Sequence, residues 1–189
     1  MSAIVESLSV LRDVLLIRPP VHADARGTFV ETYQRHRYVS LGIGQRFVQD
    51  NLSKSKRHVL RGLHYQHPNG QGKLVRVAAG MVWDVVVDVR LGSPSFGIWA
   101  GVRLSAEDQH QLFIPSGFAH GFVVLTKEAV FEYKCTAVYE PKSEQCLKWD
   151  DPQVGIEWPV SRPIISERDG AGATLADLRR RGALPAYES

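Results

Sequence analysis

Short runs of β-branched and aromatic residues, each interrupted by Gly, Pro or Ser, dominate this sequence. Such runs are typical of strands, and helical periodicity is weak by comparison. An all-β chain with many strands must protect its sheet edges, and a closed or double-sheet barrel does so. Short helices are predicted at 31–41 and 174–181. Strands are predicted at 45–51, 73–79, 81–90, 97–104, 111–114, 121–125, 129–137 and 145–149.

The length of 189 residues fits one domain, and no repeat or linker divides the chain. We expect a barrel core at about 45–150, an N-terminal strand and helix segment at 1–44, and a C-terminal extension at 151–189.

Charge and cysteine content narrow the classes of function. The net charge is +3, and the Lys and Arg residues are scattered, which suits a small anionic substrate at least as well as nucleic acid. Cys135 and Cys146 make no disulfide framework and no CxxC pair. Residues 1–16 lack the apolar core of a signal peptide, and no run is long enough to span a bilayer. We therefore expect a cytoplasmic protein that binds neither nucleic acid nor membrane.

The segment 81–90 alternates in a way that bears on function. Side chains alternate with period two along a strand, so Asp84 and Asp88 share one face with valines. A half-polar cavity or a subunit contact explains that face as well as a solvated outer surface does.

A first polar cluster contains Arg61, His64 and Lys73. Histidine accepts protons near neutral pH, although a lone His in a barrel is more often an ordinary hydrogen-bonded residue. Arg61 and His64 are three residues apart and would face opposite sides of a regular strand. A bulge at Gly62 would turn both side chains inward.

A second cluster, Pro115-x-Gly117-x-x-His120, matches the second half of the cupin-barrel signature, in which the His points into the barrel. The first half, His-x-His followed by a Glu, is missing around His64 and His67. A site of two His and one carboxylate is therefore not expected from these positions.

A third cluster places Tyr133 and Tyr139 at the same parity. A tyrosine stays protonated at neutral pH and can donate to a carbanion. Two core tyrosines with satisfied hydroxyls would give the same pattern.

Longer segments extend these clusters. They include DARG at 24–27, FVQDN at 47–51, VLRGLHYQ at 59–66, GKLVRV at 72–77, IPSGFAHGF at 114–122, EYKCTAVYEP at 132–141, WDDP at 149–152 and SERD at 166–169. In this order, across about 14–170, they closely resemble the dTDP-4-dehydrorhamnose 3,5-epimerase family. The combination of VLRGLHYQ, GKLV and PSGFAHGF is highly specific.

The resemblance implies a cupin-type jelly-roll β-barrel with a few short peripheral helices, a dTDP-linked substrate, no cofactor and no metal, and a homodimer. His64 would be the general base, oriented by Asp169, and Tyr133 the general acid on the opposite face of the sugar. Lys73 would lie near the ketone oxygen. The expected substrate-binding residues are Arg26, Glu31, Gln49, Asn51, Arg61, His120, Tyr139, Glu144 and Arg168, with Tyr139 stacking on thymine.

The implied reaction converts dTDP-4-dehydro-6-deoxy-D-glucose to dTDP-4-dehydro-L-rhamnose. A 4-ketone acidifies the protons on C3 and C5, so one base and one acid can invert both centres through an enolate. Alternatives are an epimerase acting at C3 or C5 alone, a metal-dependent cupin oxygenase, and a cupin that only binds nucleotide sugars. The sequence departs from the family pattern at Arg168, where Lys is expected, and at His58, where Gly is common.

Overall fold

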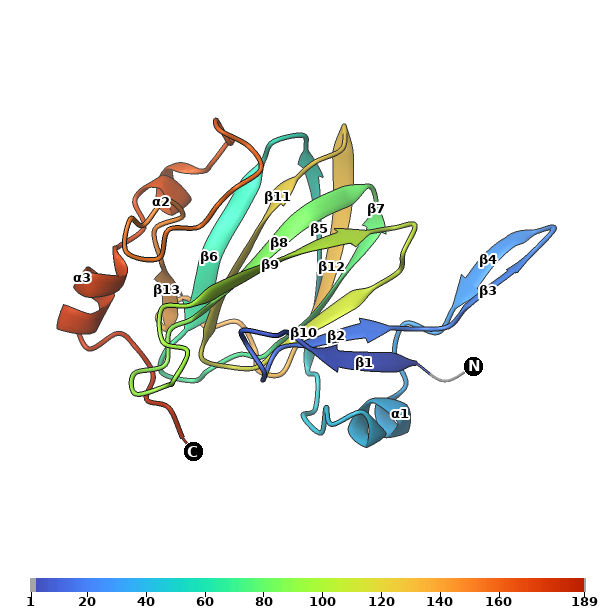
Figure 1. Cartoon of the computed structure of the whole chain (residues 1–189), viewed down its shortest axis with the longest axis horizontal. Helices are drawn as coiled ribbons and strands as arrows, with labels where there is room; N and C mark the ends of the chain where they lie inside the picture. The colour runs from blue at the N-terminus through green and yellow to red at the C-terminus, as the bar shows by residue number, and fades with distance from the viewer. Residues whose placement is uncertain (1–2, 189) are drawn as a thin grey trace.

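The computed structural model describes residues 3–188, whose strands form two facing antiparallel sheets (Figure 1). Within these residues the six-stranded sheet has the order β1 (Ile4–Ser7), β2 (Leu15–Arg18), β10 (Gln111–Ile114), β7 (Lys73–Ala79), β12 (Glu128–Cys135) and β5 (Gln49–Lys56). The five-stranded sheet has the order β13 (Glu144–Cys146), β6 (Leu60–Gln66), β11 (Phe118–Val124), β8 (Met81–Asp88) and β9 (Trp99–Ser105).

Alternation along the strands builds the core between the sheets. Val75 and Val77 of β7 point inward and meet Val82 and Val86 of β8, with Phe131 of β12 among them. All five side chains are almost completely buried. Burying each valine or phenylalanine contributes about 1.5–3 kcal/mol relative to exposure, so this layer is the main support of the barrel.

The outer faces of both sheets are also covered. Val85, Val87 and Val89 pack beneath the C-terminal extension, which contributes Leu175 and Leu178. That extension carries α2 (Glu167–Gly170) and α3 (Leu175–Arg180). The outer face of the six-stranded sheet packs under α1 (Arg35–Ser40) and the loop that follows it.

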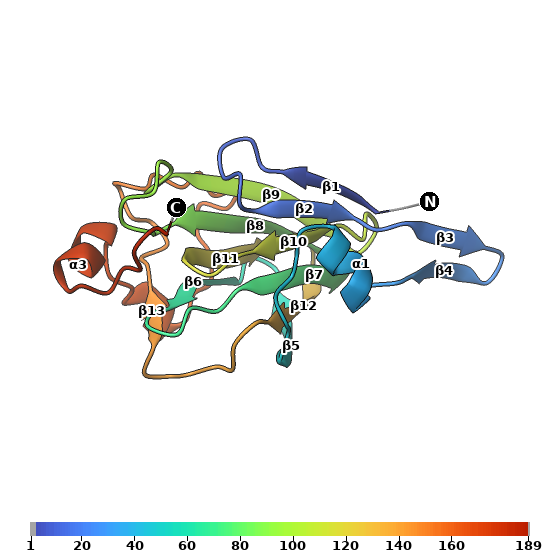
Figure 2. The ribbon, with the colours of Figure 1, turned by 90° about the horizontal axis from the view of Figure 1, so that it is seen from below.

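A two-stranded hairpin of β3 (Val21–Asp24) and β4 (Gly27–Val30) projects away from the barrel (Figures 1 and 2). Most of its side chains are exposed, including Phe29 at 70%. The pattern of residues 21–30 predicted neither strand, because little of the hairpin is buried.

The predicted strands at 73–79 and 111–114 match β7 and β10. The predicted strand at 45–51 is wrong in its bounds, because pairing with β12 continues as far as Lys56 and residues 45–48 form a loop. The helix predicted at 31–41 is shorter, because Gln34 caps it by accepting the N–H of Arg37. No helix in 3–188 is both long and apolar enough to cross a membrane.

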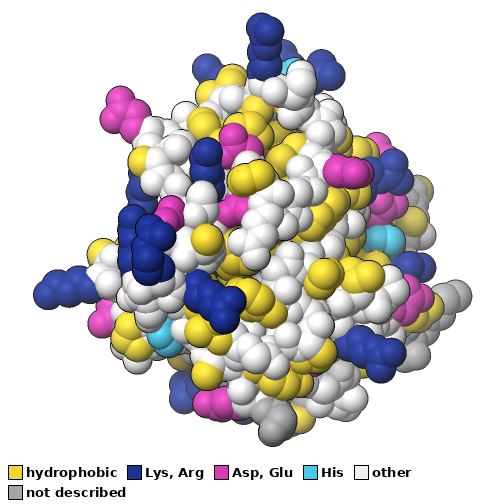
Figure 3. All heavy atoms as spheres, turned by 60° about the vertical axis from the view of Figure 1, so that its left-hand side comes forward, with side chains coloured by type: hydrophobic (Ala, Val, Ile, Leu, Met, Phe, Trp, Pro, Cys, Tyr) yellow, Lys and Arg dark blue, Asp and Glu magenta, His cyan; other side chains and the backbone are white. Residues whose placement is uncertain are grey.

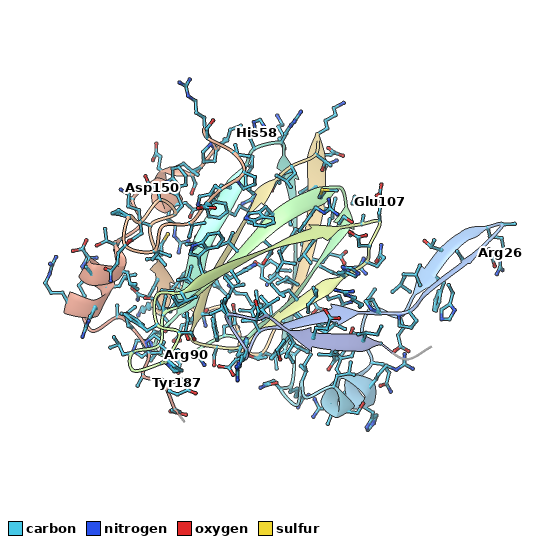
Figure 4. The ribbon with its side chains drawn as sticks, viewed as in Figure 1. Arg26, His58, Arg90, Glu107, Asp150 and Tyr187 are labelled. Atoms are coloured by element: carbon cyan, nitrogen blue, oxygen red, sulfur yellow. The ribbon has the colours of Figure 1, made fainter. Side chains whose placement is uncertain are left out.

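The acid groups of β8 are buried rather than solvated. Asp84 and Asp88 both have fully buried side chains, which contradicts the solvated-face alternative. Asp88 lies at the strand end, where Arg90 donates two hydrogen bonds to its carboxylate. Arg90 itself lies 4.2 Å from the ring centroid of Phe118 and 4.9 Å from that of Tyr187 (Figure 4). Asp88 thus joins the barrel to the end of the chain through Arg90, whereas Asp84 pairs with His120, which lines a cavity.

Candidate active site

A cavity of about 420 Å³ opens between the two sheets. Strands β5, β7 and β12 supply one wall, β6 and β11 supply the other, and the segment around α2 forms part of the rim. Polar side chains dominate the lining, together with the aromatic rings of Phe122 and Phe131. Its residues are Gln49, Asn51, Ser53, Arg61, His64, Gln71, Lys73, His120, Gly121, Phe122, Phe131, Tyr133, Tyr139, Glu144, Ser166, Arg168 and Asp169.

His64 and Asp169 form a hydrogen-bonded pair in the cavity wall. His64 Nε2 lies 2.7 Å from Asp169 Oδ1, and the Gly62 N–H donates to Asp169 Oδ2 at 3.2 Å. Burial raises the pKa of Asp169, but the hydrogen bonds from His64 and Gly62 outweigh it and leave that pKa below its ordinary value. The carboxylate is therefore ionised at neutral pH and can hold the imidazole in one orientation.

A bulge in β6 turns both polar side chains of this strand into the cavity. The pairing with β11 shifts register, since His64 opposes His120 whereas Arg61 opposes Phe122. Gly62 has a φ of 112°, and an added Cβ would lie 2.6 Å from the carbonyl oxygen of His120. The expected bulge is confirmed, and its tight approach to β11 requires glycine.

Tyr133 and Lys73 enter the cavity from the opposite sheet. Tyr133 belongs to β12, and burial raises the pKa of its phenol, so the hydroxyl stays protonated at neutral pH. Lys73 of β7 donates through Nζ to the backbone oxygen of His64 at 3.3 Å. An imidazole from one sheet thus lines the same cavity as a phenol hydroxyl and an amine from the other sheet.

A second and more deeply buried His–carboxylate pair adjoins the same cavity, where His120 belongs to the lining and Asp84 is fully buried. His120 Nε2 is 2.9 Å from Asp84 Oδ2, and the side chains are 7% and 0% exposed. Burial lowers the pKa of His120 and raises that of Asp84. His120 also stacks on Phe131, with ring centroids 6.0 Å apart.

Polar groups ring the mouth of the cavity. Gln49 accepts the N–H of Tyr139 at 2.8 Å, and the Tyr139 hydroxyl donates to Glu144 at 2.5 Å. Arg168 also pairs with Glu144. Arg61, on the other side, donates to Ser55 at 2.9 Å. Cationic groups here can hold an anionic ligand. The face of the molecule in Figure 3 shows Lys and Arg side chains in several separate places and not in one patch.

Neither Arg26 nor Glu31 lines the cavity of its own chain. Arg26 lies at the tip of the hairpin, far from the barrel, and pairs with Asp24 (Figure 4). Glu31 pairs with Arg37 of α1 at 2.7 Å. The other eleven expected site residues all lie in the lining.

Several lining residues escaped prediction. Ser53 follows Gln49 and Asn51 at the same parity on β5, so a longer predicted strand would have found it. Ser166 caps α2 by accepting the N–H of Asp169, which a capping signal reveals. Gln71 carries no such signal.

The fold and the cavity define a two-sheet barrel in which an imidazole and a phenol hydroxyl line one cavity from opposite sheets. A family model described as dTDP-4-dehydrorhamnose 3,5-epimerase matches residues 9–177. The chain belongs to this family, and the expected cupin-like jelly-roll fold is confirmed.

Individual relatives carry the same description as the family model. The dTDP-4-dehydrorhamnose 3,5-epimerase of Salmonella typhimurium is 54% identical over 167 residues, covering 86% of this chain and 91% of that protein. The enzyme of the same name from Neisseria gonorrhoeae is 52% identical over 171 residues, or 90% of this chain. The chain spans 52%, about half, of that relative's length.

Among solved structures, the dTDP-6-deoxy-D-glucose-3,5-epimerase of Legionella pneumophila in complex with dTDP-4-keto-L-rhamnose has a TM-score of 0.95 and 48% identity. The match covers 99% of this chain and 100% of that chain.

Proposed function

We propose that this chain inverts C3 and C5 of dTDP-4-dehydro-6-deoxy-D-glucose to give dTDP-4-dehydro-L-rhamnose. The observation that carries the proposal is the pairing of His64 on one sheet with Tyr133 on the other, both facing a single cavity. Inversion requires a proton to leave one face of a carbon and another to arrive on the opposite face.

His64 acts as the base in this proposal. It removes the proton from the carbon beside the ketone and becomes a cation, whose charge the ionised Asp169 offsets at 2.7 Å. Tyr133 then delivers its hydroxyl proton to the other face of the same carbon. A positioned acid or base contributes about 10²–10⁴-fold to the rate.

The enolate intermediate places negative charge on the ketone oxygen. Lys73 is buried in the cavity wall, and its amine is the group we assign to that oxygen. Burial lowers the pKa of Lys73 below its ordinary value, although the nearby Asp84 carboxylate opposes this shift. A donor placed in advance in a dry site is worth about 3–4 kcal/mol.

The nucleotide is assigned to the mouth of the cavity. Arg61 and Arg168 would hold the diphosphate, and Tyr139 would stack on the base. Gln49, Asn51, His120 and Glu144 would contact the remaining polar groups. Arg168 is paired with Glu144, so the diphosphate must compete with that carboxylate for the guanidinium.

Arg26 and Glu31 require a second copy of the chain. We propose a homodimer in which the projecting hairpin of one copy reaches the cavity of the other. The exposed Phe29 and the distance of Arg26 from its own cavity support this arrangement. Mixing Arg26→Ala with His64→Ala protein should restore activity, because each mixed dimer keeps one intact cavity. Unchanged inactivity, with mixed dimers verified by mass spectrometry, would exclude the exchange.

Incubation with the 4-keto substrate in heavy water, followed by NMR, tests the reaction. Deuterium at both C3 and C5 is expected. Deuterium at one carbon would establish a single-site epimerase, and no deuterium with tight nucleotide-sugar binding would establish a binding protein. Turnover that depends on an added metal would support an oxygenase-type cupin.

A further inference from the structure

Cys146 lies beside the His64–Asp169 pair, although the proposed reaction gives it no role. The register of β13 on β6 places Cys146 directly opposite His64, so both side chains project to the same face. A ring nitrogen of His64, the sulfur of Cys146 and a carboxylate oxygen of Asp169 all lie within 4.8 Å of one another. Within residues 3–188, no other three His, Cys, Asp or Glu side chains converge in this way.

We propose that His64, Cys146 and Asp169 form a binding site for a soft divalent cation of the zinc type. Nitrogen, thiolate and carboxylate are the ligands that zinc takes in proteins, and three of them leave a fourth position open. Magnesium and calcium prefer oxygen ligands alone, so the sulfur selects against them. The open position would face the cavity and accept water.

The geometry requires only small adjustments. Tetrahedral zinc with bonds of about 2.0–2.3 Å holds its ligand atoms roughly 3.3–3.6 Å apart. The 2.7 Å contact between His64 and Asp169 must open slightly, and the separations to Cys146 are at most 4.8 Å, so any change needed there is small. The Gly62 N–H holds the second carboxylate oxygen, as outer hydrogen bonds do in known metal sites.

The thiol is available because its present contacts are weak. Its hydrogen-bond acceptor is the Leu147 carbonyl, at 3.9 Å. A cation binds the thiolate, so the thiol releases its proton when the site is filled.

Occupancy would stop the reaction, because a cation on Nε2, the nitrogen that faces Asp169, leaves the one ring proton on Nδ1. His64 then has no free lone pair with which to accept the substrate proton. This consequence rests on the proposed function, whereas binding of the cation does not. The site would act as an inhibitory switch that responds to free zinc.

Binding is tested with metal-free protein that carries no histidine tag. Zinc is titrated by calorimetry and cobalt by visible absorption. We expect one equivalent of each metal and a thiolate-to-cobalt charge-transfer band. Cys146→Ala should abolish the band and weaken zinc binding at least about tenfold, since even outer-shell losses cost 10–100-fold. Cys135→Ala, which removes the other cysteine, should bind as wild type does.

Activity supplies a second measurement. Zinc should inhibit wild-type turnover, and a chelator should restore it. Cys146→Ala should turn over normally but need at least about ten times more zinc for the same inhibition. Equal zinc affinity in both proteins, or a cobalt spectrum without the thiolate band, would overturn the proposal. If Cys146→Ala does not fold, Cys146→Ser provides the same comparison. Zinc bound through Cys146 in a chain that shows no turnover would contradict only the proposed epimerase.

Discussion

Two His–carboxylate pairs of the same chemical type occupy this cavity at different depths. His64 and His120 are directly opposite one another on neighbouring strands. The His64 side chain is 27% exposed and its Asp169 partner 7%, whereas His120 and Asp84 are 7% and 0% exposed. The hydrogen-bond lengths of 2.7 and 2.9 Å hardly differ. Depth, rather than local geometry, separates the two pairs.

The pKa values of the two carboxylates are shifted in opposite directions, although burial acts on both in the same way. Both are pushed toward the neutral form, but hydrogen bonds keep the pKa of Asp169 low while that of Asp84 is raised. The accessible pair can exchange a proton with a ligand. The deeper pair stacks on Phe131 and lies near Lys73, so we interpret it as support for the cavity floor, at which His120 reaches the lining.

The largest expected effect is on turnover, and it concerns the His64–Asp169 pair alone. His64→Ala should lower kcat by about 10³–10⁴-fold, because it removes the proposed base. Its unfolding free energy should stay within about 1.5 kcal/mol of wild type, since Asp169 keeps the Gly62 N–H and water can replace the partly exposed imidazole. Steady-state kinetics and urea unfolding measure both. Near-wild-type turnover would show that another group takes the proton.

Tyr133 lies on the sheet opposite the His64–Asp169 pair and is the proposed proton donor. Tyr133→Phe removes only the hydroxyl and should lower kcat by about 10²–10³-fold without changing stability measurably. Because the base remains, proton removal at C5 should continue, and deuterium uptake there is the measurement. Absence of all exchange would contradict a donor that acts after the base.

The same comparison shows what residues alone could predict. Alternation along β8 placed both aspartates on one face but left that face either solvated or enclosed, because period two does not say which side meets the core. Gly62 indicated the bulge in β6 directly. The link between His64 and Asp169 spans 105 residues, so it came from the family resemblance rather than from local pattern. The hairpin of β3 and β4 carries no burial pattern, and the use that we propose for it depends on a second copy.

Disrupting the deeper pair, His120 and Asp84, should lower the free energy of unfolding. His120→Ala leaves Asp84 buried without its imidazole partner, and breaking such a pair costs about 3–5 kcal/mol. We expect a value near 3 kcal/mol, since the carboxyl can take up a proton and Lys73 remains nearby. Urea unfolding beside His64→Ala makes the comparison. Equal urea midpoints for His120→Ala and His64→Ala would contradict the proposal that the depth of each pair determines its contribution to stability.

The smallest effect concerns pH. The folded pKa of Asp169 lies below its ordinary value of 3.8, so its ionised form contributes stability that is present above that value and lost as the pH falls through the folded pKa. The gap in unfolding free energy between wild type and Asp169→Asn should therefore be full at pH 6 and shrink below about pH 4. Asp150→Asn, which removes a carboxylate from an exposed position (Figure 4), is the matched control. A gap that widens in acid would mean that Asp169 is protonated in the folded chain, as burial favours for Asp84, and the two carboxylates would then not differ.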